Sequence, residues 1–302
     1  MLPERVRRWA TEVLPARLVD AVPVPGGITD TIWRLTVDGD HPLILRWVEP
    51  ERFGEEGRQW VLKEALGCRL TAAAGLPTPR LVASDPDGHG TGGWANVTTF
   101  RPGQVRLEEL SQPALLALAR VAVAVHVAPV PDQERPPPFA FWGEPDPAVP
   151  VWASRPELWR RAIALAADAP PDTTAGLIHR DFHPGNTLWL GDEVSGLIDW
   201  AETSWGPPDL DVAHACSNFA MLHSVDDAVA FRRAYLEAGG RLEPEPGGWR
   251  YWQVRDILGF LPDPGPVVVA LTRQRPTLTP DGVRGRLEDL LALTLDAHRR
   301  TL

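Results

Sequence analysis

The sequence predicts an α+β fold in two lobes, a small antiparallel sheet with a helix over residues 1–101 and a mainly helical lobe over residues 102–302. Short apolar runs separated by turns rich in glycine and proline fill most of the first part, which is typical of strands. Apolar residues at helical spacing dominate the second part. Arg101-Pro102-Gly103 breaks the pattern between the two parts, so we place a hinge there.

The elements of the first lobe follow from apolar spacing and from the glycines and prolines that interrupt it. We predict helices at residues 3–17 and Glu55–Ala74, and strands at Ile32–Val37, Leu43–Val48, Leu81–Ala83 and Trp94–Phe100. Gly26 and Gly27 lie in a turn before the first of these strands, and adjacent glycines let a backbone approach a phosphate closely. A plain hairpin turn would give the same pattern.

The second lobe is predicted from a series of helical patterns. We expect helices from Leu107 to His126, at Pro156–Ala167, and at roughly 208–222, 225–239, 247–260 and 284–300. Thr187–Leu190 and Val194–Ile198 are expected to form a hairpin that follows a polar loop. Residues 129–150 are too rich in proline for regular structure, so they form either a linker or an extended loop that wraps the second lobe.

Composition excludes several classes of protein. The net charge of −10 disfavours nucleic acid or an anionic membrane as a partner. A hydrophobic content of 44% allows a sizeable core, and no window approaches the roughly 18 apolar residues of a membrane span. Cys68 and Cys216 show no metal or redox spacing, and the amino-terminal residues lack the apolar region of a signal peptide. We therefore expect a cytoplasmic protein.

The stretch Leu177–Trp200 concentrates the polar residues. The loop before the predicted hairpin contains Asp181 and Asn186, and Asp199 follows its second strand, so we expect all three side chains at one end of the hairpin. A carboxylate can accept a hydroxyl proton, and an amide oxygen with a second carboxylate can hold Mg²⁺ against nucleotide phosphates. The stretch therefore predicts phosphoryl transfer.

An alternating set of residues in the same loop leaves an alternative open. His179, Asp181 and His183 could instead bind a metal such as zinc, as in a metal-dependent hydrolase. That interpretation leaves Asn186 and Asp199 without a role. A purely structural polar turn is a further alternative.

Three pieces of this region, HRDFHPGN, GLIDW and GPPDLDVA, resemble in order and spacing the aminoglycoside phosphotransferase and choline kinase-like family. Members of that family are kinase-fold enzymes that phosphorylate small molecules, so the resemblance implies a two-lobed protein-kinase-like fold. It implies Asp181 as the catalytic base and Asn186 and Asp199 as the metal ligands. It equates Asp211 with a structural aspartate at the start of a helix, where a carboxylate can bind amides and steady the catalytic loop.

The resemblance also implies nucleotide-binding residues in the first lobe. In kinases a lysine on the third strand holds the phosphates and pairs with a glutamate from the next helix. The only lysine of this chain, Lys63, lies on that predicted helix, so Arg46 is our candidate for the phosphate cation. Glu64 is its expected partner, with Glu56 as the alternative.

The same resemblance assigns nucleotide contacts to two further segments. Gly26 and Gly27 resemble the turn that covers the nucleotide, and the backbone around Thr98 and Phe100 is expected to face the adenine. The implied reaction transfers the γ-phosphoryl group of ATP, or of GTP, to a hydroxyl group of a small molecule, with Mg²⁺ as cofactor. A catalytically inactive, nucleotide-binding regulator with the same fold is the alternative.

The acceptor stays open. Aminoglycosides, macrolides, choline, homoserine and sugar derivatives are all acceptors in this family. Carboxylates such as Glu202 and Asp256 would suit an amine-bearing acceptor. Aromatic side chains such as Trp205 and Trp252 would suit a quaternary amine or the apolar face of a macrolide. The sequence predicts no oligomeric state.

Overall fold

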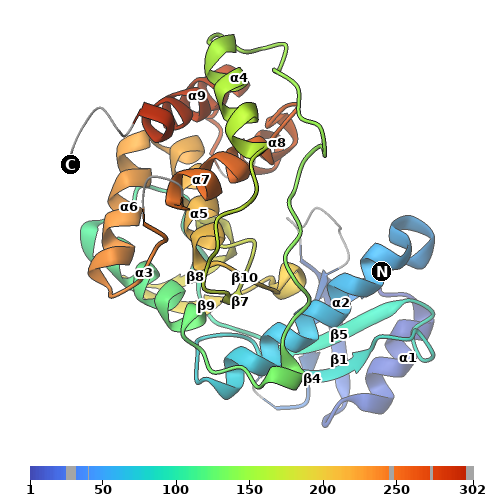
Figure 1. The fold of residues 1–302 in the computed structure, drawn as a ribbon. Coiled ribbons are helices and arrows are strands. Elements are labelled where there is room, and N and C mark those ends of the chain that lie inside the picture. Colours follow the sequence, from blue (N-terminus) through green and yellow to red (C-terminus); the bar gives the residue numbers. More distant parts are fainter. Residues whose placement is uncertain (25–31, 40, 245–247, 273–274, 297–302) are drawn as a thin grey trace.

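The computed structural model describes residues 1–24, 32–39, 41–244, 248–272 and 275–296. Its amino-terminal part contains a five-stranded antiparallel sheet in the order β1-β2-β3-β5-β4. The strands are β1 (Leu18–Pro23), β2 (Ile32–Val37), β3 (Leu43–Val48), β4 (Leu81–Asp85) and β5 (Trp94–Thr99). The predicted small antiparallel sheet is confirmed, and Figure 1 shows it at one end of the molecule.

The helices α1 (Glu4–Val13) and α2 (Pro50–Ala73) cover opposite faces of this sheet. Trp9 of α1 belongs to the same buried cluster as Leu45 of β3. Successive side chains of a strand alternate between faces, so Arg46 points the other way. On that second face Asn96 of β5, the cross-strand partner of Arg46, donates to the Val61 carbonyl oxygen of α2 at 2.8 Å. The face that carries Arg46 therefore lies directly under α2.

The first lobe departs from the sequence predictions mainly at the ends of elements. The helix predicted for residues 3–17 ends at Val13, and the chain continues into the edge strand β1, which had not been predicted. α2 begins at Pro50, before its predicted start, because proline fits the first turn of a helix, where no N–H partner is needed. Gly54 interrupts α2 with a positive φ of 52° that glycine adopts readily.

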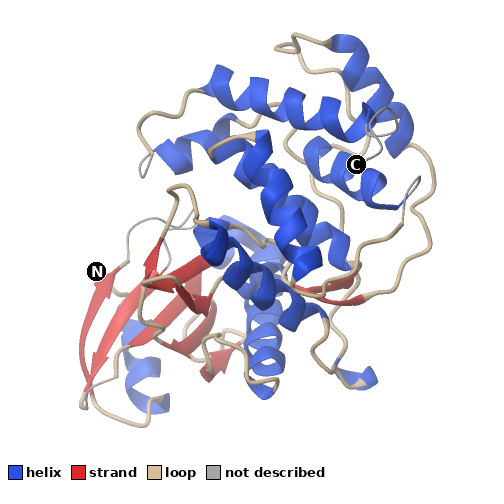
Figure 2. Ribbon diagram, turned by 90° about the vertical axis from the view of Figure 1, so that its left-hand side faces the viewer, coloured by secondary structure: helices blue, strands red, loops and turns tan. Residues whose placement is uncertain are grey.

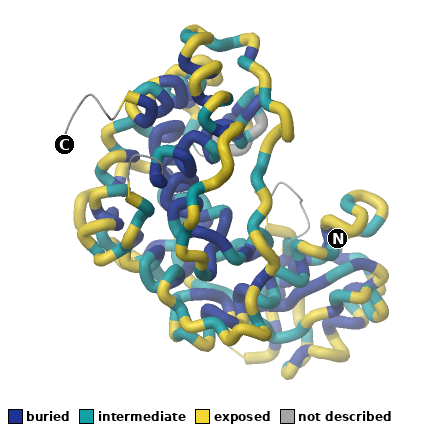
Figure 3. Tube along the Cα trace, viewed as in Figure 1, coloured by how far each residue is buried: buried dark blue, intermediate teal, exposed yellow. Residues whose placement is uncertain are grey.

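The carboxy-terminal part is mainly helical, as predicted (Figure 2). Its helices are α3 (Gln112–His126), α4 (Pro156–Ala166), α5 (Pro208–Leu222), α6 (Val225–Glu237), α7 (Gly248–Leu258), α8 (Gly265–Thr272) and α9 (Pro280–Asp296). Residues 209–222 of α5 are all buried, because α6, α7 and α9 pack around this helix (Figure 3). α3 starts later than predicted, at a cap formed by Ser111, and α8 had not been predicted.

Short strands fix the polar loop from both sides. β8 (Thr187–Leu190) and β9 (Glu193–Leu197) form the predicted hairpin, and β6 (Gln104–Val105) pairs with β8. β7 (Gly176–Ile178) leads into the loop and pairs with β10 (Ser204–Gly206). The 3-10 turn η2 (Pro184–Asn186) forms the end of the loop, and the 3-10 turn η3 (Trp200–Glu202) follows the hairpin. The polar loop thus begins and ends on paired strands.

The proline-rich residues 129–150 run as an extended loop over the helical part, one of the two predicted alternatives (Figure 1). The 3-10 turn η1 (Asp132–Glu134) is its one helical turn among the described residues. Phe139 donates its N–H to the Trp205 carbonyl oxygen at 3.1 Å, and its ring packs edgewise on Trp252. The loop is therefore packed onto the helical part rather than serving as a free linker.

The crossing from the sheet to the helical part follows β5. Arg101 donates from Nε to the Ser195 carbonyl oxygen at 2.9 Å, and Gly103 has a φ of 134°, which favours glycine. The hinge at Arg101–Gly103 stays a prediction. Within the described ranges, none of the helices combines the length and the apolar character needed to cross a membrane.

Candidate functional site

The loop between β7 and β8 is held by its backbone. Asp211, in the first turn of α5, accepts hydrogen bonds from the N–H groups of His179 (2.8 Å) and Arg180 (2.7 Å). These bonds stabilise Arg180 at a φ of 72°, which few residues other than glycine adopt. Burial raises the pKa of Asp211, but the hydrogen bonds and charges of His126 and His179 together outweigh burial and lower it. Asp211 thus makes the loop-steadying contacts that were predicted for it.

Asp181 presents its carboxylate within this loop, and its side chain is 30% exposed. Oδ2 accepts a hydrogen bond from Asn186 Nδ2 at 2.8 Å, whereas Oδ1 lies 3.1 Å from His214 Nε2 and 3.6 Å from His183 Nε2. Burial raises the pKa of Asp181, but the two histidines outweigh it and hold this pKa well below its ordinary value. The carboxylate is therefore ionised at neutral pH, as a proton acceptor must be.

Asn186 and Asp199 lie side by side at the open end of the hairpin. The N–H of Ile198 donates to the Asn186 carbonyl oxygen at 2.9 Å, which joins the two segments. Asn186 directs its Nδ2 toward Asp181, which turns its Oδ1 away. Asp199 adopts a φ of 63° and keeps its side chain 37% exposed. An amide oxygen beside a carboxylate fits Mg²⁺, which prefers oxygen ligands.

Arg46 connects the sheet to this end of the hairpin. Its Nε donates to Glu64 Oε1 at 2.9 Å, and its Nη2 donates to Asp199 Oδ1 at 2.8 Å. The second oxygen of Glu64 accepts from Asn96 Nδ2 at 2.9 Å. Burial lowers the pKa of Arg46, but Asp199 and Glu64 outweigh it and raise the pKa, so the guanidinium stays charged. Glu64, and not Glu56, is the glutamate that pairs with Arg46.

The structure gives less information about the other residues that were predicted to bind the nucleotide. Gly26 and Gly27 lie outside the described residues. Thr98 is buried within β5, and its neighbour Phe100 follows the strand beneath the Arg34 guanidinium, which lies 4.8 Å from the ring centroid. The Phe100 N–H donates to the Pro42 carbonyl oxygen at 3.3 Å. Because this donor is occupied, an adenine contact at this point would use carbonyl oxygens or the residues beyond Phe100.

The structure does not assemble the alternative metal site of His179, Asp181 and His183. The His179 ring is fully buried, packs on Trp200, and lies 2.9 Å from the Ile198 carbonyl oxygen through Nε2. Only Asp181 and His183 approach each other, with 3.6 Å between Oδ1 and Nε2. Across the described ranges, no group of three histidine, cysteine or acidic side chains is arranged to hold a metal ion.

The sequence interpretation missed His214 and assigned Asp256 to a different task. His214 Nδ1 lies 3.0 Å from Asp256 Oδ1, and the Asp256 side chain is 0% exposed. His214 is three residues after Asp211 on one helix, so both face the loop. That spacing in the sequence was the signal that could have identified His214.

The other suggested acceptor residues are also occupied. Glu202 forms an ion pair with Lys63 at 3.2 Å. Trp252 is 1% exposed and packs with Phe139. Trp205 is covered by the guanidinium of Arg135, 5.0 Å from its ring centroid. These contacts do not favour recognition of an amine by Glu202 or of a quaternary amine by these tryptophans.

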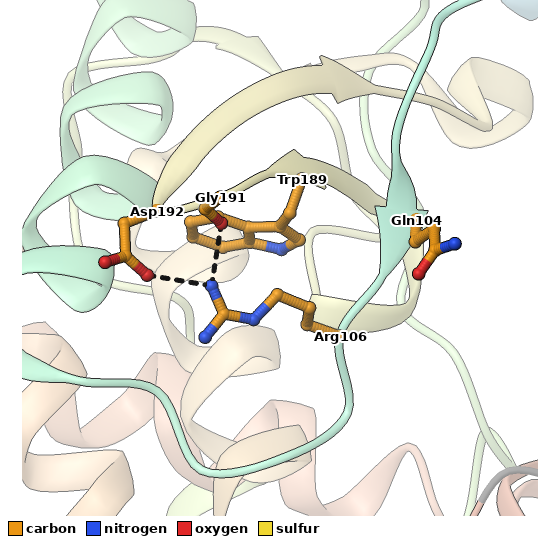
Figure 4. Close-up of a pocket in the computed structure, with 5 residues that line it drawn as sticks. All are labelled: Gln104, Arg106, Trp189, Gly191 and Asp192. Atoms are coloured by element: carbon orange, nitrogen blue, oxygen red, sulfur yellow. Dashed lines mark hydrogen bonds and ion pairs between the residues drawn. The ribbon is translucent and has the colours of Figure 1, made fainter.

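A shallow cavity of about 410 Å³ lies at the opposite end of the hairpin and is separate from this site. It is lined by Gln104, Arg106, Trp189, Gly191 and Asp192. Figure 4 shows Arg106 reaching across it to the Gly191 carbonyl oxygen (2.9 Å) and to Asp192 Oδ1 (3.0 Å). Asp192 is therefore a turn residue with a local partner, as expected.

The fold and the site together define a class of protein. A small sheet with α2 over one face packs on a helical part, and a cation, an amide and two carboxylates meet between them. This is the two-lobed, protein-kinase-like arrangement. The chain belongs to the phosphotransferase enzyme family, whose profile matches residues 20–252. The predicted family and fold are confirmed.

Solved structures share this fold at low sequence identity. One is a thermostable mutant of an aminoglycoside phosphotransferase in ternary complex with AMP-PNP and hygromycin B, with a TM-score of 0.58 and 19% identity over 95% of this chain and 98% of that chain. Another is an amicoumacin kinase in complex with AMP-PNP, Ca²⁺ and its ligand, with a TM-score of 0.57 and 16% identity over 89% of this chain and 88% of that chain.

Curated relatives match over shorter stretches. A homoserine kinase of Bradyrhizobium sp. (strain BTAi1 / ATCC BAA-1182) is 40% identical over 83 residues. The match covers 26% of this chain and 24% of that relative. The chain thus aligns with about a quarter of the length of this curated relative.

Proposed function

We propose that the protein transfers the γ-phosphoryl group of ATP, or of GTP, to a hydroxyl group of a small molecule. The observation that carries this proposal is a series of neighbouring polar residues that leads from the sheet to the loop, with the bond from the Ile198 N–H to the Asn186 carbonyl oxygen joining its two halves. Arg46 binds Asp199, Asp199 lies beside Asn186, and Asn186 binds Asp181. This order would suit a phosphate cation, two metal ligands and a proton acceptor along the path of a transferred phosphoryl group, which supports the proposal.

Each residue has a role in this proposal. Arg46, held by Glu64, binds the α- and β-phosphates, since a planar guanidinium suits phosphate oxygens. Asn186 and Asp199 hold Mg²⁺, which when bound neutralises charge on the phosphates. Asp181 orients the acceptor hydroxyl and accepts its proton as the new oxygen–phosphorus bond forms and the bond from the γ-phosphorus to the departing nucleoside diphosphate breaks. Catalysis then comes mainly from positioning and from stabilising charge.

The first lobe supplies the remaining nucleotide contacts in this proposal. Gly26 and Gly27 cover the phosphates, and the segment from Thr98 through Phe100 borders the adenine, with its carbonyl oxygens as acceptors. The boundary of the nucleotide-binding lobe at residue 101, with the catalytic and acceptor-binding lobe over residues 102–302, belongs to the same proposal. Two buried, unpaired cysteines support a reducing compartment such as the cytoplasm.

The acceptor is a hydroxyl-bearing small molecule. Aminoglycosides, amicoumacin and homoserine, named for similar proteins, are the first candidates to test. Asp256 is fully buried and paired with His214, and Glu202 is paired with Lys63, so neither supports a polycationic acceptor over a small amino alcohol. We therefore place amino alcohols and hydroxy amino acids beside aminoglycosides in the panel.

The test is an acceptor screen with ATP and Mg²⁺ that follows both ADP release and the product. We expect one compound of the panel to accelerate ADP release, and ³¹P NMR to show a phosphate monoester of that compound. Tight nucleotide binding with no accelerated acceptor in a broad panel would instead support an inactive regulator. Stoichiometric zinc in the purified protein, with hydrolysis in the absence of ATP, would support a metal-dependent hydrolase.

A further inference from the structure

We propose that His214 is a positioning residue for this reaction: held by Asp256 from one side, it fixes the carboxylate of Asp181 in the direction of the acceptor hydroxyl. The inference rests on the proposed function, because His214 would act on the reaction only through Asp181. The proposal adds two charged residues, His214 and Asp256, to the site. Neither of them belongs to the polar loop that contains Asp181 and Asn186.

The two carboxylates beside His214 favour hydrogen on both of its ring nitrogens. Nε2 lies 3.1 Å from Asp181 Oδ1, and Nδ1 lies 3.0 Å from Asp256 Oδ1. A bare nitrogen lone pair at either position would face a carboxylate oxygen and be repelled, so the ring donates at both. Asn218 Nδ2 also lies 3.1 Å from Nε2, but this amide has another acceptor, the His214 carbonyl oxygen at 3.0 Å. Burial lowers the pKa of His214, but Asp256 and Asp181 outweigh it and raise the pKa to about 9. His214 is therefore an imidazolium between two carboxylates.

The ring of His214 is also fixed in orientation. Phe260 stacks on it with ring centroids 5.9 Å apart and an interplanar angle of 7°. Trp142, from the proline-rich loop, meets it edgewise at 5.0 Å. His214 itself is 4% exposed on the buried helix α5. A hydrogen bond from a ring that cannot turn transmits a fixed direction to its acceptor.

Asp256 is placed to hold His214 rather than to meet a substrate. Its side chain is 0% exposed, and its second oxygen has no hydrogen-bond partner among the described residues. Arg180 Nη1 lies 3.9 Å from Asp256 Oδ1, so a second cation balances its charge. The guanidinium of Arg180 in turn lies 3.8 Å from the centroid of Trp142. Asp256 thus acts on Asp181 only through other side chains.

The consequence for Asp181 is that both of its oxygens are held. Asn186 holds Oδ2 at 2.8 Å, and His214 holds Oδ1. Without His214, the remaining neighbour of Oδ1 described here is His183 at 3.6 Å, beyond good hydrogen-bond distance. The carboxylate would then be free to rotate about one contact, and a misplaced reacting group can lower a rate by up to roughly 100-fold.

Two substitutions of His214 each retain one of its two hydrogen bonds to carboxylates and remove the other. Glutamine places an N–H near the position of Nε2 and retains the bond to Asp181, whereas asparagine reaches only the position of Nδ1 and retains the bond to Asp256. With the best acceptor of the panel, we expect His214→Asn to lower kcat by about 10- to 100-fold and His214→Gln to recover much of that loss. Nucleotide affinity should stay within about twofold in both. His41→Asn, at an exposed histidine just before β3, is the control.

Asp256→Asn is a further substitution in this kinetic experiment. It should lower kcat in the wild-type background but add little to His214→Asn, because Asp256 acts through His214. A kcat for folded His214→Asn within about twofold of wild type, or equal losses in the two His214 variants, would overturn the proposal.

A measurement without turnover separates this proposal from the proposed function. In protein labelled with ¹⁵N-histidine, the His214 signals are identified by their loss in His214→Gln. We expect both ring nitrogens to be protonated at neutral pH, with Nε2 shifting in Asp181→Asn and Nδ1 shifting in Asp256→Asn. Unchanged His214 signals in both variants would overturn the positioning role even if no acceptor is found. Absence of phosphoryl transfer by the wild-type protein would overturn only the proposed function.

Discussion

Each end of the candidate site has a cation between two carboxylates, and the two cations differ in kind. Arg46 lies between Glu64 and Asp199 at the proposed nucleotide end. His214 lies between Asp256 and Asp181 at the proposed acceptor end. The arrangement of charges is the same, although the first joins the sheet to the hairpin and the second lies wholly within the helical part.

Arg46 and His214 differ in the number of groups that each can bind. A guanidinium is charged under all ordinary conditions and offers several N–H groups, so Arg46 can keep its carboxylates and still bind phosphate. An imidazolium has two N–H groups, and in His214 both are occupied by carboxylates. The first cation can therefore act on a ligand, and the second can act only on the position of Asp181.

The largest expected effect comes from removing the carboxylate at the nucleotide end. Asp199→Ala removes a proposed metal ligand, so Mg²⁺-dependent binding of an ATP analogue should weaken by at least roughly 100-fold, which calorimetric titration with and without Mg²⁺ would measure. Asp192→Ala, in the turn at the other end of the same hairpin, should bind normally. Equal affinity in the wild type and Asp199→Ala would contradict the metal role.

Removing the cation at that end should lower stability. Arg46→Met leaves Glu64 buried without its ion-pair partner, and breaking a buried pair in this way costs about 3–5 kcal/mol. Thermal unfolding would show the loss, together with weaker nucleotide binding. Arg17→Met is the matched control, because Arg17 and Asp38 form an exposed pair and their separation should change the Tm little. Similar melting temperatures for the two variants would contradict the structural importance of Arg46.

Another buried carboxylate of the helical part binds a backbone N–H and, among the described residues, forms no ion pair. Asp209, on the same helix as His214, accepts a hydrogen bond from the Glu243 N–H at 3.0 Å. Burial is the largest influence and raises the pKa of Asp209. The hydrogen bond from the Glu243 N–H and the charge of His126 only partly offset burial, the Glu243 charge adds to it, and the pKa rises from 3.8 to about 6. Because the folded-state pKa exceeds the unfolded value, the folded protein binds more protons between these two values, and stability falls as the pH rises through that window.

Asp209→Asn removes this charge and keeps an oxygen for the Glu243 N–H. The free energy of unfolding above about pH 6 should rise, with an upper bound of roughly 3 kcal/mol from the difference in pKa. The difference in Tm between the variant and the wild type should be larger near pH 7.5 than near pH 4.5. A gain that is the same at both pH values would show that charge on Asp209 is not its source.

The nucleotide end could be predicted largely from the sequence because its signals are local. Asp181, Asn186 and Asp199 lie within one loop and hairpin. β2 alternates and β3 is a compact apolar run, so the predicted limits of both strands match the structure. Arg46 followed from the scarcity of lysine. The choice between Glu64 and Glu56 could not be made from the sequence, because it depends on how α2 is rotated against the sheet.

The acceptor end was harder to predict because its contacts are long-range. His214 and Asp256 are 42 residues apart and meet only when α5 and α7 pack together. The sequence around a buried histidine in an apolar helix does not indicate which distant residue will bind its side chain. The edge strand β1 was missed for a related reason: its exposed and half-buried residues follow no clear alternation. Prediction therefore failed where the pattern depends on packing between distant segments.

The most direct test of the account is the turnover of Asp181→Asn with saturating ATP, Mg²⁺ and the best acceptor of the panel. Asparagine preserves the size of the side chain but cannot accept the hydroxyl proton, so kcat should fall by about 10²- to 10⁴-fold while nucleotide affinity changes little. Asp192→Asn should turn over normally. Turnover of Asp181→Asn near the wild-type rate would contradict the assignment of Asp181 as the base.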